Sequence, residues 1–284
     1  MMNLSKKIDF AVIIGVKNAN PNGDPLNGNR PRTSYDGIGE ISDVCLKRKI
    51  RNRLMNKGHS IFVQSEDNKL DDAKSLKDRY VKILGDSVEL DKACKTWLDV
   101  RAFGQLFAFS ASEGKKGKKD IGADGDSGST DGVSVPVRGP VSLHSAFSIE
   151  PVNITSIQIT KSVNSESTDS GKKSSDTMGM KHRVDEGVYV FYGSMNPQLA
   201  EKTGFSHEDA KAIKEVLATL FENDASSARP DGSIRVMKVI WWEHSSKEGN
   251  YSSAKVHGSL KVAKDGSYNL TPLKGLEPEE IDGF

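Results

Sequence analysis

The sequence has little cysteine and no long apolar run. Its two cysteines, Cys45 and Cys94, make neither a disulfide framework nor a zinc-binding pattern. No stretch approaches the ~18 consecutive apolar residues that cross a bilayer. Asp9 interrupts the short apolar run near the N-terminus, and no small-residue cleavage site follows it, so a secretory signal is not predicted. We therefore expect a cytoplasmic protein with no membrane partner.

Motifs of the common enzyme classes are absent as well. The chain contains no GxxxxGK[ST], GxGxxG or GxSxG motif, which argues against the usual nucleotide and acyl-transfer chemistries. Its six histidines show neither HxxxH nor HExxH spacing. Residues 120–126 resemble a calcium loop only weakly, because Gly122 stands at a ligand position. We expect no metal site and no cofactor.

Charge is balanced overall but not locally. The chain has 40 Lys and Arg against 39 Asp and Glu, a net charge of +1. This balance argues against a protein that coats nucleic acid with its whole surface, but it allows one basic groove. Residues 44–65 contain no acid and follow a loop rich in Gly, Asn and Pro. The loop carries Arg30 and Arg32, and the predicted helix that follows carries Lys47, Arg48, Lys49, Arg51 and Arg53.

Such a basic block is typical of a phosphate-binding surface, because each cation can neutralise one phosphate and release counterions. A basic helix is about as often a solvated face with no partner, so the residues alone leave both interpretations open. Residues 101–104 are similarly ambiguous. They are expected either to begin a strand with a buried Phe103 or to contact RNA directly, where stacking of the ring on a base contributes ~1–3 kcal/mol.

Hydrophobic periodicity predicts a mixed α+β chain. Residues 8–16 alternate as a strand, and an apolar stripe of Leu46, Ile50 and Leu54 marks a helix from 43 to about 56, capped by Ser42 or Asp43. A second core helix begins at a capping-box-like pair, Ser206 and Asp209. Residues 66–98 predict two short inserted helices. Strands are expected at 133–141, 147–161 (with a bend), 188–192 and 234–242, followed by a hairpin at 255–262 and 268–270.

Two helices on one face of an antiparallel sheet make the ferredoxin-like or RNA-recognition-motif plan. Trp241 and Trp242 point to opposite faces of their strand, so one of them is expected in the core. Residues 110–132 have too few apolar side chains to build a core and predict a mobile loop. Residues 162–176 are similarly polar and predict the tip of a long hairpin.

The run NPNGDPLNGNRPR, the run GEISDVCLKRKIRN, and then DVRAFG, VRGPV and MGMKHRV occur in this order along nearly the whole chain. Together they resemble the backbone subunit of type I CRISPR surveillance complexes (Cascade), specifically the type I-C form. The resemblance implies one RNA-recognition-motif-like palm domain over residues 1–284. It further implies a helical finger-like insertion at 58–98 and a β-hairpin thumb at 157–187.

The resemblance also implies a function. Such a subunit is not catalytic; it polymerises along the CRISPR guide RNA, protects it and presents it for pairing with target DNA in antiviral defence. The implied partners are the guide RNA, target DNA, further copies of the chain in a helical filament, and the guide-processing and large subunits of Cascade.

The resemblance places guide-phosphate contacts at Ser42, Lys47 and Arg51. It places Met178, Met180, Lys181 and His182 near the kink of the thumb. Related subunits often carry a basic residue where this chain has Met180, so an apolar wedge against an unstacked base is the alternative there. The complete set of candidate RNA-binding residues is Asn20, Asn22, Arg30, Arg32, Ser42, Lys47, Arg48, Arg51, Arg101, Phe103, Arg138, Met178, Met180, Lys181 and His182.

A CRISPR-associated ribonuclease is the alternative function. Related proteins with this palm cut RNA by acid–base chemistry or with an acid near the RNA kink. The candidates in this chain are Asp24, Asp43 and His182. Acid–base cleavage requires a base within hydrogen-bond reach of a 2′-OH, a geometry that spacing along a sequence does not reveal.

Overall fold

Strand β1 (Ile8–Ala19) is the centre of the fold in the computed structural model, which describes residues 2–108, 134–160 and 178–284. β1 pairs antiparallel with β10 (Met178–Met195) on one side and with β11 (Ile234–Glu243) on the other. The order of the sheet is β14 (Glu279–Asp282), β11, β1, β10, β8 (Ala146–Pro151) and β4 (Ile38–Ile41). β7 (Val141–Leu143) and β9 (Ile154–Thr160) also pair with β10, so the sheet has eight strands among the described residues.

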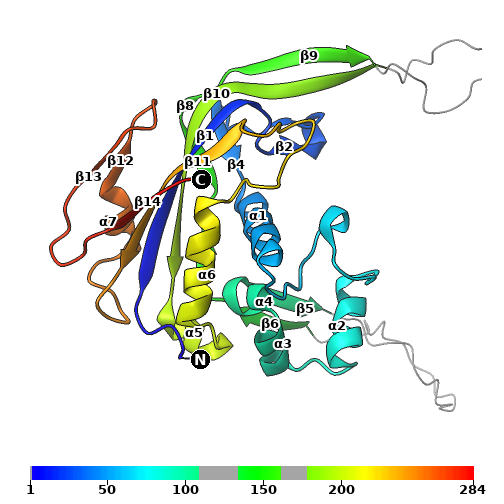
Figure 1. Cartoon of the computed structure of the whole chain (residues 1–284), viewed down its shortest axis with the longest axis vertical. Helices are drawn as coiled ribbons and strands as arrows, with labels where there is room; N and C mark the ends of the chain where they lie inside the picture. The colour runs from blue at the N-terminus through cyan, green and yellow to red at the C-terminus, as the bar shows by residue number, and fades with distance from the viewer. Residues whose placement is uncertain (1, 109–133, 161–177) are drawn as a thin grey trace, which may run out of the picture.

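Helices α1 (Asp43–Asn56) and α6 (His207–Ala218) pack side by side on one face of this sheet (Figure 1), with α5 (Pro197–Thr203) at the N-terminal end of α6. The predicted stripe of Leu46, Ile50 and Leu54 is fully buried in the core under α1. The capping box of Ser206 and Asp209 at the start of α6 is also confirmed. The two helices predicted from periodicity therefore form as expected and cover one face.

The opposite face of the sheet is covered too. Trp241 belongs to the core under α1 and α6, while Trp242 belongs to a second cluster beneath α7 (Ser253–Gly258), β12 (Leu260–Val262) and β13 (Tyr268–Leu270). Both tryptophans are therefore buried, whereas the sequence predicted only one of the two in the core. The prediction of a hairpin strand from residue 255 is wrong at its start, where the chain forms α7. The Ser252 side chain caps this helix by accepting a hydrogen bond from the Lys255 backbone amide.

A separate small core lies beside α1. It contains Phe62, Tyr80, Trp97 and Phe107, contributed by α2 (Leu76–Leu84), α3 (Leu90–Thr96) and their surroundings. Helix α4 (Leu98–Phe103) then leads into β5 (Gly104–Ala108), which pairs with β6 (Ser134–Arg138) apart from the main sheet. Figure 1 shows this insertion next to α1, away from α7 and the β12–β13 hairpin.

The prediction that residues 101–104 begin a strand is wrong, because 101–103 are helical and the strand starts at Gly104. Gly104 has φ +82°, and a Cβ there would lie 2.3 Å from the backbone oxygen of Val137. Only glycine fits both this conformation and this close approach. The glycine therefore sets the boundary between α4 and β5.

β9 and β10 form a long hairpin that projects from the body (Figure 1). The strand predicted over 147–161 is interrupted at residues 152–153, so it forms two strands, β8 and β9, while β9 itself pairs without a bulge. The predicted strand at 188–192 is the middle of the 18-residue β10. The predicted mobile loop at 110–132 and the predicted hairpin tip at 162–176 lie outside the described residues. None of the helices in the described part of the chain has the length and apolar character needed to cross a bilayer.

Candidate nucleic-acid interface

The loop between β1 and β4 is anchored by its own asparagines. Asn20 is buried, and its Nδ2 donates to the backbone oxygen of Asn29 at 2.7 Å. Asn22 Oδ1 accepts from both the backbone nitrogen and the Oγ of Ser42, each at 2.9 Å. The Oγ of Ser42 in turn accepts from the Cys45 amide and caps α1. The three candidate RNA-binding residues Asn20, Asn22 and Ser42 therefore hold the loop against the start of α1.

Within that loop, β2 (Gly23–Asp24) and β3 (Arg30–Pro31) form a short hairpin around the 3₁₀ turn η1 (Pro25–Asn27). Arg32 Nη2 lies 3.3 Å from Asp24 Oδ1 at its base, and both side chains are about one-third exposed. Arg30 is half-buried and has no ion-pair partner among the described residues. This small hairpin holds two arginines at the edge of the α1 face.

The two cations near the start of α1 are paired at the surface. Lys47 Nζ lies 3.0 Å from Asp43 Oδ2, one turn earlier on the helix. Arg48 Nη2 lies 2.7 Å from Oδ1 of Asp67, which belongs to the 3₁₀ turn η2 (Glu66–Asn68). Arg48 is 54% exposed and Asp67 is 74% exposed. Lys47 and Asp43 are 26% and 36% exposed. The exposed pair of Arg48 and Asp67 contributes ~0–1 kcal/mol, so Arg48 is available to another anion at little cost.

The cations further along α1 are held more firmly. Arg51 Nε donates to Asp99 Oδ2 at 2.9 Å, and its guanidinium lies 5.1 Å from the centre of the Phe103 ring. The buried Asp99 also accepts from the amides of Phe62 and Val63 at 2.7 and 3.0 Å. Arg51 is only 13% exposed, so it does not present the free cation that the sequence suggested. It joins α1 to the insertion, and Phe103 packs against it.

Arg101 has a structural partner as well. Its Nε and Nη2 donate to Oδ2 and Oδ1 of Asp209 at 2.8 and 2.7 Å, a bidentate pair that ties α4 to the start of α6. Removing one partner of a buried pair costs ~3–5 kcal/mol. The guanidinium of Arg101 is therefore engaged in a structural ion pair. Arg138 ends β6 opposite Gly104 and has no ion-pair partner in the described part of the chain.

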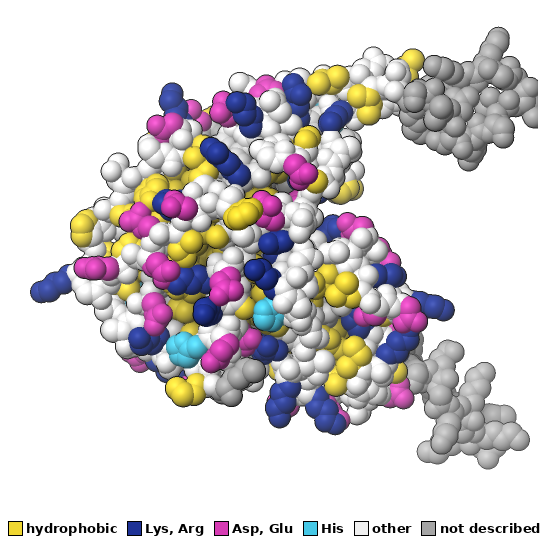
Figure 2. Space-filling model, in the orientation of Figure 1, with side chains coloured by type: hydrophobic (Ala, Val, Ile, Leu, Met, Phe, Trp, Pro, Cys, Tyr) yellow, Lys and Arg dark blue, Asp and Glu magenta, His cyan; other side chains and the backbone are white. Residues whose placement is uncertain are grey.

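The projecting hairpin exposes apolar side chains. Met178 and Met180 are 61% and 55% exposed, and Ile159 on the paired strand β9 is 48% exposed. Figure 2 shows hydrophobic side chains along this arm beside lysines and arginines. His182 differs, since it is buried and its Nδ1 lies 2.8 Å from Ser156 Oγ, while the neighbouring Lys181 is half-buried. Large exposed apolar patches are typical of interaction surfaces, so these side chains make the arm a candidate for one.

Two residues that the sequence did not single out complete the α1 face. Asp224 bonds to Lys49 of α1, and Arg229 Nε lies 3.1 Å from the same carboxylate. Their loop is fixed to the C-terminal end of β1, because the backbone nitrogen of Asn20 donates to the backbone oxygen of Ala228 at 2.9 Å. No sequence signal could have found them, since 175 residues separate Lys49 from Asp224.

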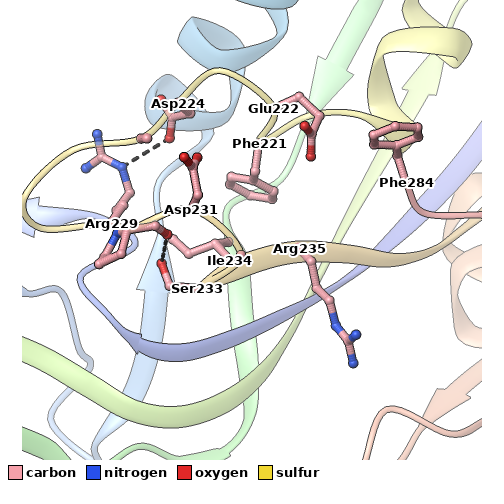
Figure 3. Close-up of a pocket in the computed structure, with 12 residues that line it drawn as sticks. Phe221, Glu222, Asp224, Arg229, Asp231, Ser233, Ile234, Arg235 and Phe284 are labelled. Carbon is pink, nitrogen blue, oxygen red and sulfur yellow. Dashed lines mark hydrogen bonds and ion pairs between the residues drawn. The ribbon is translucent and has the colours of Figure 1, made fainter.

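That loop also lines a pocket of about 350 Å³ (Figure 3). In the figure, Arg229 points toward Asp224, while Arg235 extends away from them on β11. Three carboxylates, Glu222, Asp224 and Asp231, and two arginines, Arg229 and Arg235, line the pocket. The pocket therefore carries no excess of positive charge, and the cations of α1 do not line it.

Each of the three ribonuclease candidates has a partner of its own in the fold. Asp24 caps η1 through the Leu26 amide, Asp43 pairs with Lys47, and His182 contacts Ser156. No hydrogen bond joins any two of these three residues. Across the described residues there is also no group of three or more His, Cys, Asp or Glu side chains that could hold a metal ion.

A cluster of titratable groups lies under α7, on the far face of the sheet. The buried Asp9 carboxylate lies 2.8 Å from His244 Nε2, 3.2 Å from Lys7 Nζ and 3.7 Å from His257 Nε2. His244 Nδ1 accepts from the Asn250 amide, so its proton sits on Nε2 and points to Asp9.

These surroundings shift two pKa values. Burial alone would raise the pKa of Asp9, but the hydrogen bond from His244 and the Lys7 charge leave that pKa lowered. Burial lowers the pKa of His257. The cluster ties α7 to β1 and β11, and a change in its protonation would act on stability.

A cation-rich helix packed on an antiparallel sheet, beside an arm with exposed apolar side chains, is typical of proteins that hold a polyanion. The chain belongs to a family described as CRISPR-associated protein Cas7, whose family model matches residues 6–282. A CRISPR-associated protein Cas7 from Haloferax volcanii is 27% identical over 299 residues, covering 97% of this chain and 81% of that protein.

Solved chains are similar at a more distant level. One belongs to a CRISPR RNA-guided surveillance complex described as pre-nicking; it is 16% identical with a TM-score of 0.46, and the match covers 83% of this chain and 78% of that one. Another, from a CRISPR RNA-guided surveillance complex, has the same identity and TM-score and covers 92% and 77% of the two chains.

Proposed function

We propose that this chain is a non-catalytic, RNA-binding backbone subunit of a CRISPR surveillance complex, of the type I-C form. Membership of the Cas7 family supports the assignment to such a complex. The observation that carries RNA binding is the row of cations on α1, next to a loop that its own asparagines hold in place. Phosphate contacts of this kind position a strand without reading its bases, as a guide of variable sequence requires.

The geometry divides the candidate residues by role. Lys47, Arg48, Arg30 and Arg32 lie at or near the surface and would contact phosphates directly. Asn20, Asn22 and Ser42 would position the loop. Arg51 and Phe103 would support α1 through Asp99, and Arg101 would support α6 through Asp209.

The remaining parts of the molecule fit the same proposal. The sheet with α1 and α6 would be the RNA-recognition-motif-like palm, residues 58–98 the finger region, and residues 157–187 the thumb. The exposed Met178 and Met180 would meet an unstacked base or a neighbouring copy of the chain. In a filament along the guide RNA, repeated copies would present the guide to target DNA, with the guide-processing and large subunits at its ends.

The experiment is co-expression of the chain with guide RNA and its partner subunits, followed by purification. We expect RNA in the purified assembly, seen in its ultraviolet absorbance ratio and on a denaturing gel. Lys47→Ala with Arg48→Ala should lose most of that RNA, because two phosphate contacts disappear while the core of α1 is untouched.

The control is Lys211→Ala, which removes an exposed cation on the outer side of α6 that pairs only loosely with Glu215. It should leave the RNA content unchanged. An assembly of wild-type protein that contains no RNA would contradict the proposed function, and so would cleavage of the guide that Asp24→Ala or His182→Ala abolishes.

A further inference from the structure

A pocket of about 230 Å³ opens beside α1, between the loop after β1 and the loop 224–229. We call it the Arg48 pocket. Its charged and amide-bearing lining consists of Asn22, Arg48, Lys49, Asn52, Asp67, Asp224 and Arg229. This lining comes from four separate parts of the chain, yet it places three cations around one small space.

The two carboxylates of the Arg48 pocket are held very differently. Asp224 is four-fifths buried and bonds to two cations, Lys49 and Arg229. Asp67 is 74% exposed and bonds to one, through a single contact of 2.7 Å with Arg48 Nη2. It also belongs to the one-turn 3₁₀ helix η2. Asp224 is a fixed part of the pocket, and Asp67 is a replaceable one.

Asp67 is charged at neutral pH. The nearby Ser65 hydroxyl and the Arg48 charge lower the pKa of Asp67. It therefore acts on Arg48 as a full anion. With Asp67 in place the pocket holds three cations against two carboxylates; without it, three cations face one carboxylate. The open pocket then carries the charge to bind one phosphodiester.

We propose that the Arg48 pocket is a phosphate subsite of the RNA surface and that Asp67 occupies the phosphate position until RNA displaces it. The inference rests on the proposed function. A phosphodiester is the better partner, because its two oxygens can accept two hydrogen bonds from the Arg48 guanidinium. Asp67 accepts only one hydrogen bond from Arg48. Asn22 Nδ2 offers a further donor, since its single contact, with the Gly23 oxygen, is 3.4 Å long.

The exchange has a consequence for selectivity. A weak internal anion lowers the attraction of the free chain for any passing polyanion, because every ligand must first displace Asp67. A strand that contacts several cations at once displaces it easily, while a single anion in solution does not. Asp67 therefore favours long RNA over isolated phosphate groups.

The test measures binding of fluorescein-labelled oligouridine to the full chain by fluorescence anisotropy over a series of salt concentrations. Asp67→Asn should bind about 3- to 5-fold more tightly than wild type at low salt, because one exposed competing charge is gone. The gain should shrink as salt rises, and the plot of log affinity against log salt should become steeper. Asp67 is exposed, so the substitution should leave the thermal midpoint unchanged.

Two controls make the test specific. Asp72→Asn removes an exposed carboxylate of the insertion that pairs with Lys82, away from the pocket, and should bind like wild type. In an Arg48→Ala background, Asp67→Asn should have no further effect, because the two residues act as one pair.

Wild-type protein that binds no oligouridine would contradict the proposed function itself. Wild-type binding together with equal affinity and equal salt slope for Asp67→Asn would overturn only the inference. A gain that persists without Arg48 would also overturn it, since the effect would then be one of overall charge.

Discussion

Asp99 is the residue on which the connection between α1 and the insertion depends. It is buried and accepts three hydrogen bonds, from Arg51 Nε and from the amides of Phe62 and Val63. Asp99→Ala leaves two buried amides and one guanidinium without their acceptor. Each orphaned buried group costs ~1–3 kcal/mol, and removing one partner of a buried ion pair costs ~3–5 kcal/mol. Because these terms overlap, we expect a loss of ~3–5 kcal/mol in the free energy of unfolding.

Urea unfolding followed by far-ultraviolet circular dichroism measures this loss. Asp86→Ala provides the matched control, since Asp86 is an exposed carboxylate in the turn between α2 and α3 and should change stability by less than about 0.5 kcal/mol. A double-mutant cycle with Arg51→Ala should give a coupling energy of at least ~1 kcal/mol. A loss below ~1 kcal/mol for Asp99→Ala would refute the reasoning, because the buried amides would then have another acceptor.

Three further predictions concern the core, a turn and pH. Leu217→Ala should cost ~2–5 kcal/mol in urea unfolding, because Leu217 is fully buried under α6, yet the refolded variant should still bind RNA. Gly104→Ala should lower the thermal midpoint clearly, since the added Cβ would meet the Val137 oxygen. The control Gly204→Ala, at φ +75° with open space around it, should cost only ~1–2 kcal/mol. Equal losses for the two variants would contradict the account of Gly104. His257 has a lowered pKa in the folded chain, so the unfolded chain binds more protons just below pH 6.5, and stability should fall as the pH drops through that value. His257→Gln should reduce this fall in thermal melts recorded over a range of pH. An unchanged pH profile would show that His257 is not responsible.

The sequence predicted the parts of the fold that depend on local patterns. The starts of α1 and α6 follow from Ser42, Ser206 and a 3.6-residue apolar period, signals that lie within a few residues of one another. The helical nature of residues 101–103 did not follow, because Arg101 and Phe103 fit a strand pattern equally well and the deciding contact of Gly104 comes from Val137.

The sequence also located the cations of the interface but not their state. Lys47 and Arg48 stand in an acid-free stretch, yet the carboxylates that neutralise the α1 cations include Asp67, Asp99 and Asp224, which only the folded chain brings to them. Charge counted along a sequence does not report charge presented at a surface, because pairing across 48 residues, as between Arg51 and Asp99, is invisible to it.

The most direct measurement is an electron cryo-microscopy structure of the chain assembled with guide RNA. It should show phosphates within about 4 Å of Lys47 Nζ and the Arg48 guanidinium, with Asp67 displaced from Arg48. Lys47 and Arg48 facing solvent, with the polynucleotide on another surface of the protein, would contradict the central claim.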